Sequence, residues 1–180
     1  VDLPGHGHSP VAGAMTLAGV AGAVAASVPS GATWIGWSLG GLVALSGALQ
    51  GAGIERLALV AATPRFVTAP DWPWAVPASV LSGFARDLEG DYRATLQRFL
   101  ALQARGSKQR REELRRLREL LFARGEPAIG ALRGGLELLA RSDLRAALGE
   151  VRCPTLLIQG QRDTLVPEAA ADASAAALPN

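Results

Sequence analysis

The sequence predicts an α/β fold in which a doubly wound parallel sheet carries an all-helical insertion. Three apolar runs, at residues 32–37, 56–61 and 154–159, are continuous rather than alternating, which is typical of parallel strands buried on both faces. Helical patterns separate the strands, and this alternation implies right-handed crossovers. At the end of the first run, Gly36-Trp37-Ser38-Leu39-Gly40 predicts a tight strand-to-helix turn.

A helix is expected before the first run, over residues 16–28, with Thr16 as its N-cap. Residues 11–28 carry no charge and are long enough to raise the question of a membrane span. We reject that interpretation because the run is mostly Ala and Gly and lies between Pro10 and Pro29. A buried or half-buried helix fits the pattern better.

The remaining core elements are a strand stub at residues 1–3, a helix over 38–49 directly after the serine, and a helix after Pro167. The chain opens on Val1-Asp2 without an initiator methionine or a basic leader, so no signal peptide is expected. From these ends we expect a fragment that is truncated on both sides.

Between the second and third strands lies an insertion of residues 64–150, which we interpret as a helical lid over the active-site mouth. Residues 1–63 and 151–180 then form the incomplete α/β core. The insertion opens on a turn-rich segment and then becomes helical. Its four expected helices cover residues 78–88, 91–104, 108–124 and 127–141.

Composition indicates a folded domain: 49% of the 180 residues are hydrophobic and 19% are charged. The single cysteine, Cys153, excludes an internal disulfide framework and favours a reducing compartment. The formal net charge of +2 points to no partner by itself, although the positions of the charges do.

Ser38 is the predicted nucleophile. The pattern G-x-S-x-G between a strand and a helix lifts the serine Oγ clear of the sheet. It also leaves the backbone N–H of Leu39 at a helix N-terminus, where an oxyanion would form. The alternative is a small-residue turn that merely packs tightly.

Asp163 is the predicted acid of a catalytic triad. It follows the last apolar strand, in Gly160-Gln161-Arg162-Asp163, and functional groups in open α/β sheets lie past the carboxyl ends of strands. The chain order Ser…Asp…His, which is that of the α/β hydrolases, requires an acid at this place. The alternative is a capping aspartate before Pro167.

The general base is missing from its expected place. The only histidines, His6 and His8, precede the serine, so we assign them to loop structure rather than to catalysis or a metal site. We expect the catalytic histidine to lie beyond Asn180. Because losing one triad member costs about 10⁴–10⁶-fold in turnover, the 180 residues alone are expected to be close to inactive.

Cationic residues gather in the insertion. Residues 93–118 contain nine of them against two acidic ones, a local excess of seven that predicts an anionic macromolecular partner. A solvated helix face is the alternative. Nucleic acid is disfavoured because no aromatic residues are interleaved with the cations. The nine are Arg93, Arg98, Arg105, Lys108, Arg110, Arg111, Arg115, Arg116 and Arg118.

Together these segments resemble the pimeloyl-[acyl-carrier protein] methyl ester esterases of biotin synthesis. The strand-turn-helix segment around Ser38 alone would fit many esterases, whereas the lid segments are more specific to this family. The resemblance spans nearly all 180 residues. The segments that carry it are residues 1–5, 36–44, 98–103, 134–137 and 143–145.

The resemblance implies a cytoplasmic serine esterase that removes the methyl group from a pimeloyl chain carried on acyl-carrier protein. We also expect a monomer that needs no cofactor or metal and binds neither membrane nor nucleic acid. The resemblance implies Ser38 as nucleophile and Asp163 as acid. Three residues would surround the acyl and oxyanion pocket: Trp37, Leu39 and Phe99. Lid arginines that grip the acidic carrier would be Arg98, Arg111 and Arg115. At Ala94 the family can show a further arginine, which Arg93 would replace.

Two other readings stay open. One is a general short-chain carboxylesterase of the same fold, which free and carrier-linked methyl esters would distinguish. The other is a catalytically incomplete fragment that binds the carrier. A histidine encoded downstream in the same reading frame would exclude it.

Overall fold

The computed structural model describes residues 1–11, 15–103, 110–123 and 125–179. Its sheet consists of three parallel strands in the order β1-β2-β3, so the predicted α/β class is confirmed. The core elements are α1 (Leu17–Ala26), β1 (Thr33–Trp37), α2 (Leu39–Leu49), β2 (Arg56–Val60), β3 (Thr155–Ile158) and α7 (Glu168–Ala177), and a short 3-10 helix, η1 (Arg145–Glu150), ends the insertion before β3. The carboxyl ends of the strands meet at one edge, where Trp37 pairs with Val60 and Val60 with Ile158.

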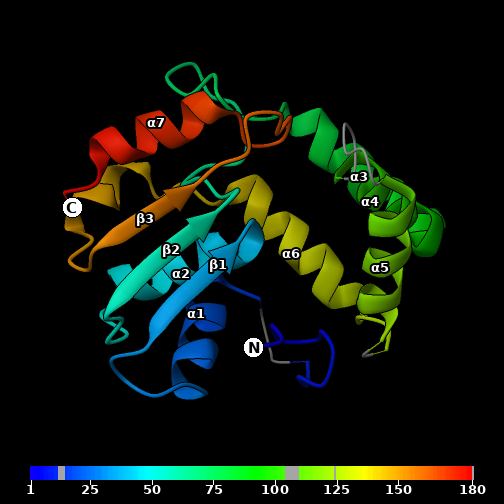
Figure 1. Cartoon of the computed structure of the whole chain (residues 1–180), viewed down its shortest axis with the longest axis horizontal. Helices are drawn as coiled ribbons and strands as arrows, with labels where there is room; N and C mark the ends of the chain where they lie inside the picture. Colours follow the sequence, from blue (N-terminus) through cyan, green and yellow to red (C-terminus); the bar gives the residue numbers. More distant parts are fainter. Residues whose placement is uncertain (12–14, 104–109, 124, 180) are drawn as a thin grey trace.

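The prediction that the strands are buried on both faces is wrong for the described residues. Burial alternates along β1, where Trp34 is buried and Ile35 is 74% exposed. Helix α2 packs against β1 and β2 from behind the strands as drawn in Figure 1, and the opposite face is open. The large apolar side chains on the open face are Ile35, Trp37, Leu156 and Ile158.

Helix α1 begins where the sequence predicts. The Thr16 hydroxyl oxygen accepts a hydrogen bond from the Gly19 N–H (3.1 Å), which satisfies one of the free donors of the first turn. The helix spans ten residues, and none of the helices in the described part of the chain is long and apolar enough to cross a membrane. Residues 1–3 form no strand, so that prediction is wrong: β1 has no partner on its outer side among the described residues.

The insertion contains the four expected helices, which extend to one side of the sheet in Figure 1. They are α3 (Ala78–Gly90), α4 (Tyr92–Gln103), α5 (Arg110–Phe122) and α6 (Ile129–Arg141). Helix α6 returns to the core and packs against α2, with Ala131 and Leu138 buried. The helical insertion therefore rests directly on α2, the helix that follows Ser38.

Two apolar clusters lie beneath the edge of the sheet where the strands have their carboxyl ends. The larger surrounds α1, α2, β1 and β2. The smaller joins Leu42 of α2 to Phe66 and Trp72, which follow β2, and to Val166, which follows β3. It therefore packs together the segments that leave the carboxyl ends of β2 and β3, where the candidate site lies.

Candidate active site

Ser38 occupies a sharp turn between β1 and α2. Its φ of 52° and ψ of −118° are unusual for a residue with a side chain, and such strained positions cluster at functional sites. The turn is fixed on both sides: the Ser38 N–H donates to the Val60 carbonyl (2.9 Å), and the Ser38 carbonyl accepts from the Gly41 N–H (2.9 Å). The local conformation is that of a nucleophile elbow.

The glycines of the elbow have different roles. A Cβ on Gly36 would lie 2.5 Å from the Gly40 carbonyl oxygen, so a side chain at this position would collide with the turn. A Cβ on Gly40 would meet no atom within 4 Å, so steric crowding does not explain the second glycine of the motif. The close approach belongs to Gly41, whose Cβ would lie 2.4 Å from the Cβ of Ala62.

Leu39 begins α2 and has the free backbone donor that an oxyanion requires. Among the described residues, none accepts a hydrogen bond from its N–H. The first N–H groups of a helix have no partner within the helix, and its dipole favours negative charge there. The Leu39 side chain does not line the cavity at Ser38 and packs against the core instead.

A cavity of about 480 Å³ opens beside Ser38. It brings together four of the residues singled out from the sequence: Trp37, Ser38, Phe99 and Asp163. Most of the remaining wall is apolar and comes from the lid and its stems. The lid residues include Val80, Leu81, Phe84, Leu96, Leu136 and Leu139.

Asp163 is held rigidly just past β3. Its Oδ1 accepts from the backbone N–H groups of Leu165 (2.8 Å) and Val166 (3.0 Å), while its Oδ2 accepts from Gln159 Nε2 (3.3 Å). Gln159 also donates to the Val166 carbonyl, which ties the loop to the end of the strand. A role for Gln159 is not predicted from the sequence, where its only signal is its place as a polar residue at the end of an apolar run.

A family model described as the alpha/beta hydrolase family matches residues 1–179. The chain belongs to the α/β hydrolase family.

Curated relatives indicate which α/β hydrolases this chain is similar to in sequence. A pimeloyl-[acyl-carrier protein] methyl ester esterase of Xanthomonas campestris is 54% identical over 100% of this chain and 71% of its own length. An esterase of the same name from Stenotrophomonas maltophilia is 51% identical over 99% of this chain and 69% of its own. The predicted resemblance is therefore confirmed.

Solved structures confirm the α/β hydrolase fold. An esterase from Exiguobacterium antarcticum superposes with a TM-score of 0.87 at 20% identity, covering 99% of this chain and 68% of its own. A hydrolase from Pseudomonas aeruginosa gives a TM-score of 0.73 at 28% identity, covering 99% of this chain and 66% of its own.

The two histidines lie on the loop that precedes α1. His6 Nδ1 lies 3.2 Å from the Pro4 carbonyl oxygen, and the His8 N–H donates to Asp2 Oδ2 (3.2 Å). Neither is among the residues that line the cavity beside Ser38. Their surroundings agree with a part in loop structure.

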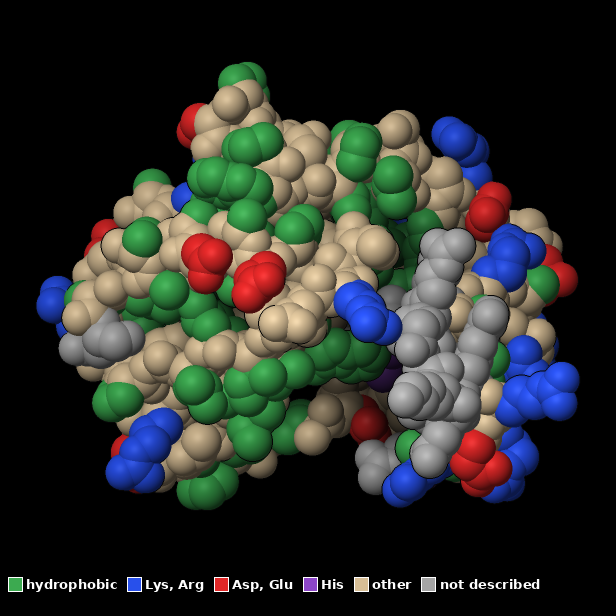
Figure 2. All heavy atoms as spheres, turned by 45° about the horizontal axis from the view of Figure 1, so that its top comes forward, with side chains coloured by type: hydrophobic (Ala, Val, Ile, Leu, Met, Phe, Trp, Pro, Cys, Tyr) green, Lys and Arg blue, Asp and Glu red, His purple; other side chains and the backbone are tan. Residues whose placement is uncertain are grey.

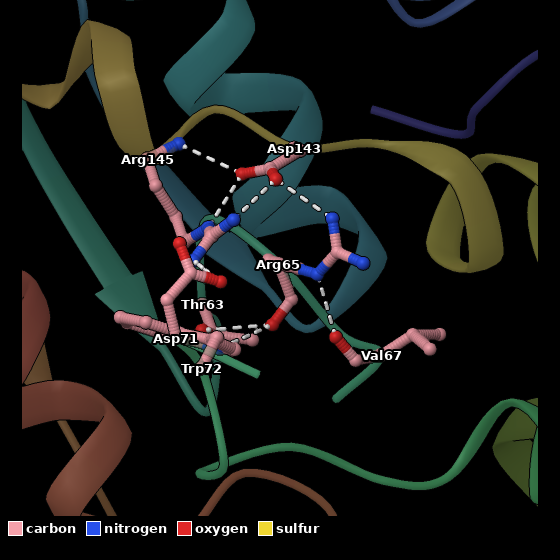
Figure 3. Close-up of polar contacts among 7 residues, drawn as sticks. All are labelled: Thr63, Arg65, Val67, Asp71, Trp72, Asp143 and Arg145. Atoms are coloured by element: carbon pink, nitrogen blue, oxygen red, sulfur yellow. Dashed lines mark hydrogen bonds and ion pairs between the residues drawn. The ribbon is translucent and has the colours of Figure 1, made fainter. Parts of the chain in front are cut away.

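A charged network joins the two stems of the α/β hydrolase lid, and we call it the clasp (Figure 3). Asp143, just after α6, accepts from Arg65 Nη1 (2.7 Å) and from Arg145 Nε (2.8 Å) and Nη2 (2.8 Å). Arg145 also pairs with Asp71 (2.9 Å) and lies over the Trp72 ring. The backbone adds a bond from the Leu144 N–H to the Pro64 carbonyl (3.0 Å).

The hydrogen bonds from Arg145 and then Arg65 hold the pKa of Asp143 well below its usual 3.8. The Asp143 partner in turn raises the pKa of Arg145. Both stems of the lid are thus joined by charge-assisted hydrogen bonds, which are stronger than neutral ones.

Asp143→Asn is expected to lower the free energy of unfolding by about 1–3 kcal/mol at neutral pH, because two arginines lose their shared charge partner. The control is Asp172→Asn, an exposed aspartate on α7. Because folding lowers the pKa of Asp143 from 3.8, its contribution is present above that pH and is lost as the pH falls through the folded-state value. Urea unfolding should therefore show the full difference at neutral pH and a difference that shrinks steadily as the pH falls below 3.8.

The lid arginines are only partly available to a partner. Arg98 donates to Asp87 (3.3 Å), and Arg115 pairs with Glu112 (2.6 Å) and Glu119 (2.8 Å), which raise its pKa. Arg93, expected to replace an arginine at position 94, pairs with Glu126. Arg105 and Lys108 lie outside the described residues.

Arg111 and Arg118 of α5 are exposed and, like Arg116, have no acidic partner in the part of the chain that the structure describes. Figure 2 shows blue side chains gathered along the edge that Figure 1 assigns to α3, α4 and α5, with acidic side chains between them. Together with Arg115 the two fall on one face of α5, at a spacing of four and then three residues. The positive charge left uncompensated on this face is therefore at Arg111 and Arg118.

Proposed function

We propose that this chain is the catalytic part of an esterase that hydrolyses the methyl ester of pimeloyl-[acyl-carrier protein] in biotin biosynthesis. The observation that carries this is Ser38 on a strained elbow, opening with Asp163 onto one largely apolar cavity. Its volume of about 480 Å³ lies in the usual range for small-molecule sites. Relatives that are 51–54% identical to this chain are named pimeloyl-[acyl-carrier protein] methyl ester esterases.

In this mechanism, Ser38 Oγ attacks the ester carbonyl and gives its proton to a histidine held by Asp163. The carbonyl oxygen becomes an oxyanion that accepts from the Leu39 N–H. Methanol leaves with the proton, and an acyl-enzyme remains. Water then attacks the acyl-enzyme with the same histidine as base, which frees Ser38 and releases the carrier-linked carboxylic acid.

Phe99 and Trp37 form part of the cavity wall that would contact the acyl chain, and they take no part in the chemical steps. Both line the cavity, and Phe99 packs against Phe84 with ring centroids 5.6 Å apart. A methylene chain that enters the cavity against the rings of Trp37 and Phe99 loses contact with water, which contributes about 0.8 kcal/mol per buried methylene group.

The direct test compares a carrier-linked pimeloyl methyl ester with free short-chain methyl esters. It uses the protein extended through its expected catalytic histidine, which we call the extended protein. We expect a higher kcat/KM for the carrier-linked ester. Equal values would favour a general short-chain esterase, and no turnover of either would contradict an esterase.

We propose that Arg111 and Arg118, with Arg98 and Arg115 beside them, face the acidic carrier. The double variant Arg111→Glu/Arg118→Glu is expected to lower kcat/KM for the carrier-linked ester about tenfold or more at low salt, because opposite charges steer encounter. Arg115→Glu is a poorer probe, because it would place a third acid between Glu112 and Glu119.

The matched control is Arg152→Glu, an exposed arginine that precedes β3 and so lies at the opposite end of the strands from Asp163. It should leave both substrates unaffected. The effect at Arg111 and Arg118 should shrink as salt is added and be absent for free esters. An equal loss on free esters would contradict docking through this face.

A further inference from the structure

Helix α6 is the helix of the lid that packs against α2, the helix that follows the Ser38 elbow. Its residues Leu136 and Leu139 line the cavity, while Ala131 and Leu138 are buried on its other side. In Figure 1 the helix runs from the lid helices toward the carboxyl end of β1. The pair Gly134-Gly135 lies near the middle of this helix.

Gly135 makes room for Leu39. A Cβ on Gly135 would lie 3.0 Å from Leu39 Cδ2, closer than carbon atoms pack at rest. The Leu39 side chain is half-buried between the backbone of α6 and the core cluster below it. The same residue carries the backbone N–H that is free at the start of α2.

Helix α6 is held along its length, so it has little freedom to retreat. At its start, the Ala128 N–H donates to the Gly5 carbonyl (2.9 Å). At its centre, a Cβ on Gly134 would lie 2.8 Å from the sulfur of Met15. At its end, the clasp binds Asp143 to Arg65. An added methyl group at position 135 must therefore be accommodated by the end of the Leu39 side chain, which has to give by a few tenths of an ångström.

We infer that Gly135 is a positioning residue for the oxyanion donor: its missing side chain lets α6 hold Leu39 so that the Leu39 N–H faces the ester oxygen at Ser38. This rests on the proposed function, since it assumes an oxyanion at that place. Deleting one oxyanion donor outright costs about 10²–10³-fold in kcat. A shift of the Leu39 side chain that is passed on to its N–H should cost a fraction of that.

The test is Gly135→Ala in the extended protein, with a free methyl ester as substrate. We expect kcat to fall about 3- to 30-fold, a partial loss of one donor, with KM changed less than about twofold. A serine-directed boronic acid, whose tetrahedral adduct carries the oxyanion, should lose affinity by a similar factor. Adding Leu39→Ala, which removes the colliding methyl group, should restore part of both.

Gly130→Ala is the matched control, since it lies on the same helix and a Cβ there would meet no atom within 4 Å. It should leave kcat and boronate affinity unchanged. Loss of thermal stability in Gly135→Ala with kcat per folded molecule unchanged would overturn the inference. So would a rise in KM alone, or no rescue by Leu39→Ala.

A readout that needs no turnover separates this inference from the proposed function. The amide ¹H–¹⁵N resonance of Leu39 should shift in Gly135→Ala and stay in place in Gly130→Ala. If the resonance shifts but the parent protein cleaves no ester, the proposed function fails and the packing stands. If the parent cleaves esters and Leu39 is unmoved, only the inference fails.

Discussion

Ser38→Ala is expected to lower ester hydrolysis by the extended protein about 10⁴–10⁶-fold, the cost of removing the nucleophile of a serine hydrolase. The chain offers no second hydroxyl at the elbow, because the neighbours of Ser38 are Trp37 and Leu39. The measurement is the initial rate of methyl ester cleavage, with circular dichroism to verify that the variant is folded.

The control for the loss of a cavity hydroxyl is Ser79→Ala. Ser79 lines the same cavity from α3, but it does not lie at a strained turn. Its replacement should change turnover by less than about threefold, as for a surface side chain outside the chemistry. A loss as large as that of Ser38→Ala would show that the nucleophile had been assigned to the wrong residue.

Ser38→Gly tests the strain at the elbow separately from the chemistry. Glycine adopts a φ of 52° without a steric penalty, and strain at such a position is about 1–3 kcal/mol. This variant should be as inactive as Ser38→Ala but should unfold at a higher denaturant concentration. The stability lost by keeping a side chain at this turn would then be a direct consequence of exposing the nucleophile.

The elbow could be predicted from sequence because everything that forms it is local. Residues 33–49 contain the strand, the turn and the helix, and their boundaries in the structure differ from the expected ones by one residue. Asp163 was predictable for a similar reason: it follows a recognisable strand, and the topology brings the ends of parallel strands to one edge.

The clasp could not be predicted from the sequence. Arg65 and Asp143 lie 78 positions apart, and in the sequence each looks like any solvated charge. Only the path of the lid brings them together. The neutralisation of Arg115 is different, because Glu112 and Glu119 stand three and four positions away on the same helix and pair by local geometry. A net charge summed over the whole insertion conceals such ion pairs. They can be found in the sequence by looking for opposite charges three or four positions apart on a predicted helix.

The strand predictions show a third kind of limit. A continuous apolar run such as residues 154–159 indicates that both faces of a strand suit burial, but not which face the described chain covers. In the structure Leu157 packs on the core, whereas Leu156 is 58% exposed. The apolar pattern predicted the strand and its parallel pairing, whereas the packing of the helices determines which face of the strand is buried.

Gly36→Ala is expected to destabilise the fold by about 3 kcal/mol or more, at the upper end of what overpacking costs. The new Cβ would lie 2.5 Å from both the Gly40 carbonyl oxygen and the Gly41 Cα. These are backbone atoms, so no rotation of a side chain can relieve the contact. The first turn of α2 must instead move away from β1, and Gly41 cannot follow freely because it lies directly against Ala62. Urea unfolding of the extended protein measures the loss.

Gly40→Ala is the matched control within the same motif. No atom lies within 4 Å of a Cβ at that position, and alanine is a better helix former than glycine by about 1 kcal/mol. The variant should therefore be as stable as the parent or more so. Equal destabilisation by both substitutions would contradict the steric argument. The opposite signs expected here would mean that only the first glycine of the G-x-S-x-G motif is required by the turn, and that the close approach of helix to sheet is secured one residue later, at Gly41.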